Sequence, residues 1–152
     1  MTLRWAARGL VLALCALATR SAAAQATQQS TRDPVSGSVL GQNYPNPFNL
    51  ETTIPFSIGG EPTCTDAGRQ YRVSLKIYNV LAQFVGTPVL QGGSSSVAGG
   101  QPLNGVLLTC GQYTAYWDGK YLANGREVAS GVYVYRLEID GKPIFRKMIV
   151  MK

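Results

Sequence analysis

Histidine is missing from the whole 152-residue sequence, and other hallmarks of catalytic chemistry are missing too. Without histidine, the chain lacks the most common general base and the catalytic triads that depend on it. It also lacks a G-x-S-x-G nucleophile elbow, a phosphate-binding glycine loop and an H-E-x-x-H zinc motif. The acidic residues are scattered, without the D-x-D-x-D spacing of a calcium loop. We therefore expect a protein that is not an enzyme and needs no cofactor.

Cysteine is scarce, with three residues in the chain: Cys15, Cys64 and Cys110. Cys15 lies in an N-terminal stretch that we expect to be removed, which leaves an even pair. In an exported chain such a pair favours one disulfide between Cys64 and Cys110, with two unpaired thiols as the alternative. Two cysteines without histidine cannot complete the usual zinc ligand set, so no metal site is expected.

The N-terminal residues 1–24 have the pattern of a secretory signal peptide. Arg4 and Arg8 form a basic start, and the apolar run over 10–18 is too short to cross a bilayer. Small residues then favour cleavage between Ala24 and Gln25. A buried N-terminal helix is the alternative. No later stretch is long enough to span a membrane, so we expect an exported protein without a stable transmembrane segment.

The positive charge of the chain comes partly from this leader. The full sequence has a formal net charge of +6, from 14 basic and 8 acidic residues. Removing Arg4, Arg8 and Arg20 leaves 11 basic residues against 8 acids, a charge of +3. Nucleic-acid binding normally requires a denser basic stripe, so no nucleic-acid partner is expected.

The mature chain divides into a short polar linker over 25–40 and one domain over 41–152. Alternation of apolar and polar residues predicts β-strands, and the dipeptides Asp118-Gly119, Asn124-Gly125 and Asp140-Gly141 predict tight turns. The strands are expected at 53–58, 71–78, 83–90, 112–117, 132–139 and 144–151. Two longer loops, 59–70 and 91–111, hold the two cysteines. The pattern predicts an all-β, Ig-like antiparallel sandwich of about seven strands.

The segment Gln42-Asn43-Tyr44-Pro45-Asn46-Pro47-Phe48-Asn49 stands out before the first predicted strand. Its two prolines fix the backbone and remove two donors, and the residue before each is pushed toward extended geometry. We expect a stiff, non-helical segment in which Tyr44 and Phe48 serve as apolar pegs. The alternative is simply a kinked first strand.

Residues 42–152 resemble a known family when these motifs are taken in order. The resemblance runs through Asn43–Asn49, then Leu75–Leu81, then Trp117-Asp118-Gly119 with Asn124-Gly125, then Ser130–Leu137, and ends with Lys147–Lys152. These residues resemble the type A C-terminal sorting domain of type IX secretion in Gram-negative bacteria. The same residues are similar to the Ig-like domain of flagellar hook-capping proteins, which is the alternative family.

The resemblance to sorting domains implies passage through the periplasm, then transfer by outer-membrane secretion machinery to the cell surface or medium. It implies recognition by Asn43, Tyr44, Pro45, Asn46, Pro47, Phe48, Asn49, Lys147, Met148 and Lys152. It implies structural roles for Trp117, Asp118, Gly119, Asn124, Gly125, Ser130, Gly131, Tyr133 and Tyr135. A terminal strand with basic outward residues could pair with a partner by edge addition. A third possibility is a small module that binds cell-surface glycan through Tyr113, Tyr116 and Tyr121.

Overall fold

A computed structural model describes residues 37–60, 64–66, 68–92 and 99–152. The predicted signal peptide, its cleavage point and most of the predicted linker lie outside these residues. The described chain contains nine strands and no helix, and therefore no helix that could cross a membrane. The strands are β1 Val39–Leu40, β2 Thr52–Ile58, β3 Gln70–Asn79, β4 Phe84–Gly86, β5 Val89–Gly92, β6 Asn104–Thr109, β7 Gly111–Trp117, β8 Gly131–Ile139 and β9 Lys142–Val150.

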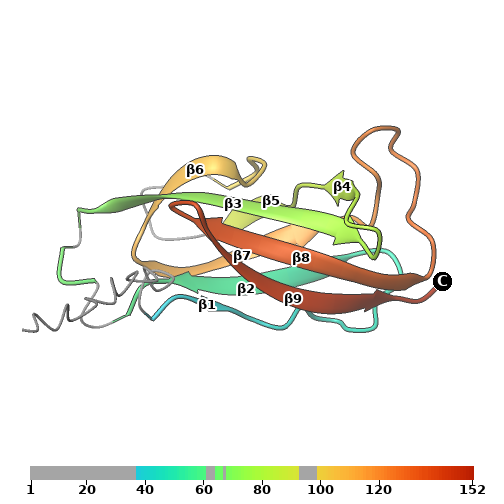
Figure 1. The fold of residues 1–152 in the computed structure, drawn as a ribbon, viewed down its shortest axis with the longest axis horizontal. Coiled ribbons are helices and arrows are strands. Elements are labelled where there is room, and N and C mark those ends of the chain that lie inside the picture. Colours follow the sequence, from blue (N-terminus) through green and yellow to red (C-terminus); the bar gives the residue numbers. More distant parts are fainter. Residues whose placement is uncertain (1–36, 61–63, 67, 93–98) are drawn as a thin grey trace, which may run out of the picture.

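Two antiparallel sheets pack face to face, which confirms the predicted all-β sandwich (Figure 1). Sheet A has the order β1-β2-β7-β5, and sheet B has the order β4-β3-β8-β9, with β6 also pairing with β3. The core forms where the inner faces meet, because alternate residues of each strand point inward. The buried side chains include Ile54, Phe56, Ile58, Val73, Leu75, Ile77, Tyr113, Ala115, Trp117, Tyr133, Tyr135 and Leu137.

The sandwich begins earlier than the predicted boundary at residue 41. Val39–Leu40 lies within the predicted linker, yet it forms β1 beside β2, with Leu40 buried. The Arg146 side chain donates to the Leu40 carbonyl and so connects β9 to this strand. Just past β1, the Gly41 N–H donates to the Pro55 carbonyl at 2.8 Å. Proline has no N–H, and at Pro55 that position lies opposite Gly41, just beyond the end of β1. The proline therefore removes no hydrogen bond from the pairing of β1 with β2.

The prediction of a single strand over 83–90 is wrong. Residues Phe84–Gly86 form β4, which pairs with β3 in sheet B, whereas Val89–Gly92 forms β5, which pairs with β7 in sheet A. The chain therefore crosses between the sheets at Thr87 and Pro88. The turn before β4 contains Ala82 with φ of +58°, a left-handed conformation that costs a side-chain-bearing residue about 1 kcal/mol or more.

The prediction of a continuous loop over 91–111 is also wrong. Asn104–Thr109 forms β6, which pairs with the first half of β3. Cys64 and Cys110 form the expected disulfide, with their Cα atoms 5.9 Å apart. It links the segment after β2 to the start of β7, at the end of the sandwich opposite the C-terminus (Figure 1).

Candidate functional site

The motif at 42–49 and the last strand, about a hundred residues apart in sequence, lie side by side. Phe48 and Val150 form a parallel bridge. The Phe48 N–H donates to the Ile149 carbonyl at 3.0 Å, and the Met151 N–H donates to the Phe48 carbonyl at 2.8 Å. We call residues 42–49 together with 147–152 the motif–β9 site. It unites both segments that the sequence assigned to recognition.

Asn43 anchors the motif to the core rather than presenting a side chain to solvent. It is 2% exposed, and its side-chain amide donates to Thr52 Oγ1 at 3.0 Å and to the Pro45 carbonyl at 3.1 Å. Its own N–H donates to the Tyr135 hydroxyl at 3.1 Å, and that hydroxyl donates to the Gly41 carbonyl at 2.7 Å. Burial raises the pKa of Tyr135, and the bond from Asn43 opposes this rise. This network holds the motif in one position.

Phe48 provides the second anchor. Its buried ring meets Trp117 edge-on, with centroids 5.7 Å apart, and Trp117 lies 6.1 Å from Tyr133. The Trp117 indole donates to the Lys120 carbonyl and the Tyr133 hydroxyl donates to the Ala129 carbonyl, so both polar tips are satisfied. Burial, with help from a bond to a nearby tyrosine, raises the pKa of Tyr133 to about 12.

The remaining motif residues face solvent. Tyr44, Pro45, Asn46, Pro47 and Asn49 are exposed, and both X-Pro bonds, Tyr44–Pro45 and Asn46–Pro47, are cis. The Ile149 N–H donates to Asn46 Oδ1 at 2.9 Å, so even an exposed member of the motif contacts β9. Together with the exposed Gln42, these five side chains form the accessible part of the motif.

The C-terminal residues divide in the same way. Met148 is fully buried and belongs to the core, whereas Lys147 is exposed. Lys152 forms an ion pair with Glu127 at 3.0 Å, and its N–H donates to Ser130 Oγ at 2.8 Å. Of the three C-terminal residues predicted for recognition, Lys147 is therefore the one most open to a partner.

The motif also occupies the outer edge of β9. Besides the Ile149 and Met151 contacts, Gln42 Nε2 donates to the Lys147 carbonyl at 3.1 Å. The edge over 147–151 thus has its hydrogen bonds made by residues 42–48. Pairing of a partner strand with this part of β9 would first require the motif to leave, so simple edge addition there is disfavoured.

The two predicted glycine turns, Asp118-Gly119 and Asn124-Gly125, flank one loop. Asp118 and Asn124 accept bonds from Lys120 and Arg126, two residues on, as expected for turn residues. Gly119 is buried beneath the motif, and a Cβ atom added to it would lie 2.6 Å from the Leu50 carbonyl oxygen. Gly131 and Ser130, also predicted as structural, lie exposed at the start of β8.

We expect Gly119→Ala to destabilise the domain by about 2 kcal/mol more than Gly125→Ala does, because only the first adds a steric clash to the backbone strain. The two glycines have nearly equal φ values, +65° and +67°, but a Cβ at Gly125 meets nothing within 4 Å. Urea unfolding of the two variants measures the difference. Equal losses of stability would show that the Leu50 carbonyl does not exclude a side chain at position 119.

The tyrosines predicted to bind glycan do not form one platform. Tyr113 is buried and stacks on Phe56, with centroids 5.5 Å apart, whereas Tyr116 lies on the opposite face of β7 and donates to Glu51 at 2.6 Å. Tyr121, together with Tyr116, borders a separate hollow of about 430 Å³ beside Trp117. The three rings therefore cannot stack on one sugar together.

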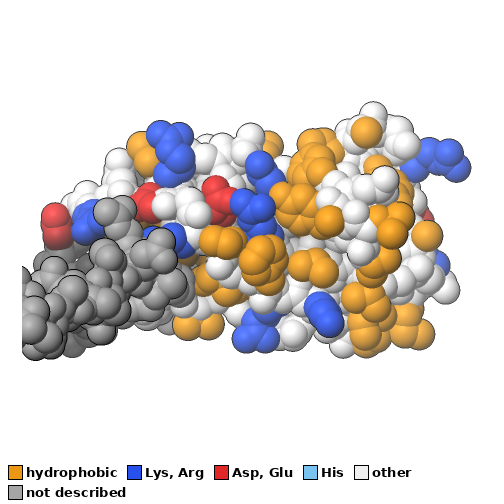
Figure 2. All heavy atoms as spheres, in the orientation of Figure 1, with side chains coloured by type: hydrophobic (Ala, Val, Ile, Leu, Met, Phe, Trp, Pro, Cys, Tyr) orange, Lys and Arg blue, Asp and Glu red, His pale blue; other side chains and the backbone are white. Residues whose placement is uncertain are grey.

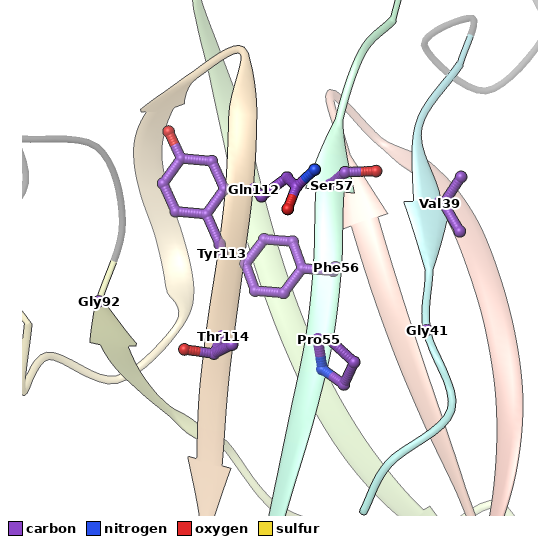
Figure 3. A pocket seen from close by; sticks show the side chains of 9 residues that line it. All are labelled: Val39, Gly41, Pro55, Phe56, Ser57, Gly92, Gln112, Tyr113 and Thr114. Carbon is purple, nitrogen blue, oxygen red and sulfur yellow. The ribbon is translucent and has the colours of Figure 1, made fainter.

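A second hollow, of about 540 Å³, lies over sheet A between β1 and β7 (Figure 3). Pro55, Ser57, Gln112 and Thr114 line it, with Phe56 and Tyr113 behind them. None of its nine lining residues is charged. In the described chain, no group of three His, Cys, Asp or Glu side chains is placed to hold a metal ion.

The fold and the site define the class of the protein as an antiparallel β-sandwich domain. No protein-family model and no curated protein matches the sequence. Among solved structures, the chain is similar to the crystal structure of dimeric latent PorU from Porphyromonas gingivalis, with a TM-score of 0.50 and 19% identity. The match covers 77% of this chain and 10% of that one, so this chain spans about a tenth of its neighbour. PorU is a component of type IX secretion, and the likeness at this identity concerns the fold.

Proposed function

We propose that the sandwich is a sorting domain of the type IX kind, a non-catalytic domain that outer-membrane secretion machinery recognises. The observation that carries the proposal is the motif–β9 site, in which two distant segments of the resemblance form one surface. The similar fold in a type IX component supports it. In this proposal residues 1–24 direct the chain to the periplasm, and the sandwich then directs it to the cell surface or medium.

Three alternative functions fit these observations less well. Of the three tyrosines of the glycan hypothesis, Tyr113 is buried in the core, so the three cannot form one binding platform. The flagellar hook-capping alternative conflicts with a secretory leader, because flagellar components use a separate export route. The uncharged lining of the hollow over sheet A offers no acid, base or nucleophilic pair for catalysis at that place.

A test must separate recognition from folding. Deleting Lys147–Lys152 would also remove Met148 and Val150 from the core, so its effect on export would be ambiguous. Substitutions of exposed residues avoid this problem. We propose the double variant Tyr44→Ala with Lys147→Ala, and the matched control Leu122→Ala with Lys120→Ala, which changes an exposed apolar side chain and an exposed lysine in another loop.

The full chain would carry a reporter between residues 30 and 31 and be expressed in a Gram-negative host with type IX machinery. We expect surface or medium localisation for the unchanged chain and the control. The motif–β9 variant should export about tenfold less reporter. A tenfold loss of affinity for the machinery corresponds to about 1.4 kcal/mol of binding free energy. Periplasmic retention of the unchanged chain would overturn the proposal.

A further inference from the structure

The outer face of sheet B carries a cluster of exposed and half-buried apolar side chains, which we call the apolar patch: Tyr78, Phe84, Val132, Val134 and Ile149. Tyr78 meets the Phe84 ring edge-on, with centroids 6.1 Å apart, and is paired with Val134. Val132 is paired with Ile149 on the neighbouring strand. Phe84, Val132 and Ile149 are 48%, 42% and 42% exposed. Figure 2 shows this face, where hydrophobic side chains gather toward the C-terminal end of the sandwich.

The surroundings of the patch are mainly basic. Lys147 is paired with Val134, and Lys76 and Arg136 are paired with each other in the next row of the sheet. All residues of β3, β8 and β9 are described, and Glu138 is the single acid among them. Its carboxylate forms an ion pair with Arg136, which leaves the positive charges of Lys76 and Lys147 to dominate the border of the patch.

The patch is continuous with the motif–β9 site. Ile149 belongs to the patch, and its N–H bonds to Asn46 Oδ1 of the motif at 2.9 Å. Asn46 therefore connects the motif to the border of the patch, whereas Tyr44 forms a bridge with Thr53 of β2 in sheet A. An exposed apolar patch beside charged residues of one sign is typical of a protein interaction surface.

We propose that the apolar patch docks a protein surface that carries apolar side chains together with Asp or Glu. The proposal rests on the proposed function and names the chemistry of the partner within the secretion machinery. The outer face of sheet B presents all five patch residues on one side, which suits a protein surface of matching shape. A membrane fits less well, since burying the patch about 5–10 Å deep would also carry the Glu138 carboxylate into the interfacial region.

The test uses the reporter-bearing full chain and two double variants of the patch. Phe84→Glu with Ile149→Glu removes apolar area and adds negative charge, whereas Phe84→Lys with Ile149→Lys removes the same area and adds positive charge. The matched control, Leu107→Glu with Leu122→Glu, changes two apolar side chains of similar exposure outside the patch. Circular dichroism and urea unfolding check that each purified variant remains folded.

We expect the glutamate variant to lose at least about tenfold in exported reporter, the lysine variant to lose less, and the control to match the unchanged chain. A photo-crosslinking residue at position 84 or 149 should attach to a protein during export, through a peptide that contains Asp or Glu. At position 107 it should attach to none.

Three outcomes overturn the inference while leaving the proposed function standing: normal export of the glutamate variant, equal losses in the glutamate and lysine variants, or crosslinks to lipid alone. Failure of the unchanged chain to reach the surface overturns the proposed function itself, and the inference with it. The two failures are therefore distinguishable in one set of strains.

Discussion

Replacing Phe48 with alanine should lower the free energy of unfolding of the sandwich by about 3–5 kcal/mol, the range for truncating a buried aromatic residue. The ring is 2% exposed and packs edge-on against Trp117. Its backbone also makes the two main-chain hydrogen bonds that join the motif to Ile149 and Met151. The cavity left by the ring would loosen those bonds, so the motif and the end of β9 should destabilise together.

Urea unfolding followed by tryptophan fluorescence measures this change, because Trp117 lies against the ring that is removed. Tyr44→Ala is the matched control, since Tyr44 is an aromatic residue of the same motif but is 57% exposed. We expect the control to change stability by at most about 0.5 kcal/mol. A Phe48→Ala variant as stable as the control would contradict the anchoring role of the ring.

The result also bears on how the motif is understood. The sequence suggested that Tyr44 and Phe48 are equivalent pegs, but one is exposed and the other is buried. Asn43 was expected among the recognition residues, yet it is buried with hydrogen bonds to Thr52 and Tyr135. Polar residues are usually exposed, and Tyr135 lies 92 residues further along the chain, so a local pattern could not reveal this contact.

Strands with one buried face were well predicted, because burial imposes a period of two on β2, β3, β7 and β8. The segment 83–90 was misread because alternation reports that a residue is buried and does not say in which sheet. A signal was available: Val85 and Leu90 are both buried but five apart, and one regular strand would place them on opposite faces. Both residues can be buried because the chain crosses from sheet B to sheet A at Thr87-Pro88.

β6 was missed for a different reason. Its apolar run Val106-Leu107-Leu108 does not alternate with polar residues, and only Leu108 is fully buried. The strand pairs with β3 at one side of sheet B, where fewer of its side chains need to be buried. Its sequence therefore shows a weaker alternation of apolar and polar residues. Its pairing with β3 depends on residues about 35 positions away, which sequence periodicity does not report.

Removing the Cys64–Cys110 disulfide should lower the free energy of unfolding by about 2–4 kcal/mol. The bond spans 46 residues of sequence, a segment that includes β3, β4, β5 and β6. Closing a loop of this length restricts the unfolded chain by about 4 kcal/mol in the chain-entropy description, which sets the upper end of the range. The native contacts of the core lie in the strands and should persist, so the loss should appear in stability and leave the fold intact.

The double variant Cys64→Ser with Cys110→Ser measures the effect by urea unfolding, with circular dichroism to confirm that the β-sheet content is kept. The unchanged protein treated with a thiol reductant is the internal control, because it should lose the same stability, whereas the reductant should not affect the double variant. A substitution at Gly59 cannot replace this test, because its Cβ atom would lie 2.3 Å from the Cys64 sulfur and would disturb the disulfide sterically. If the unchanged and double-variant proteins unfold at the same urea concentration, with equal slopes, the disulfide adds nothing, and the pairing of β2 with β7 and of β3 with β6 is enough to hold the two ends of this segment together.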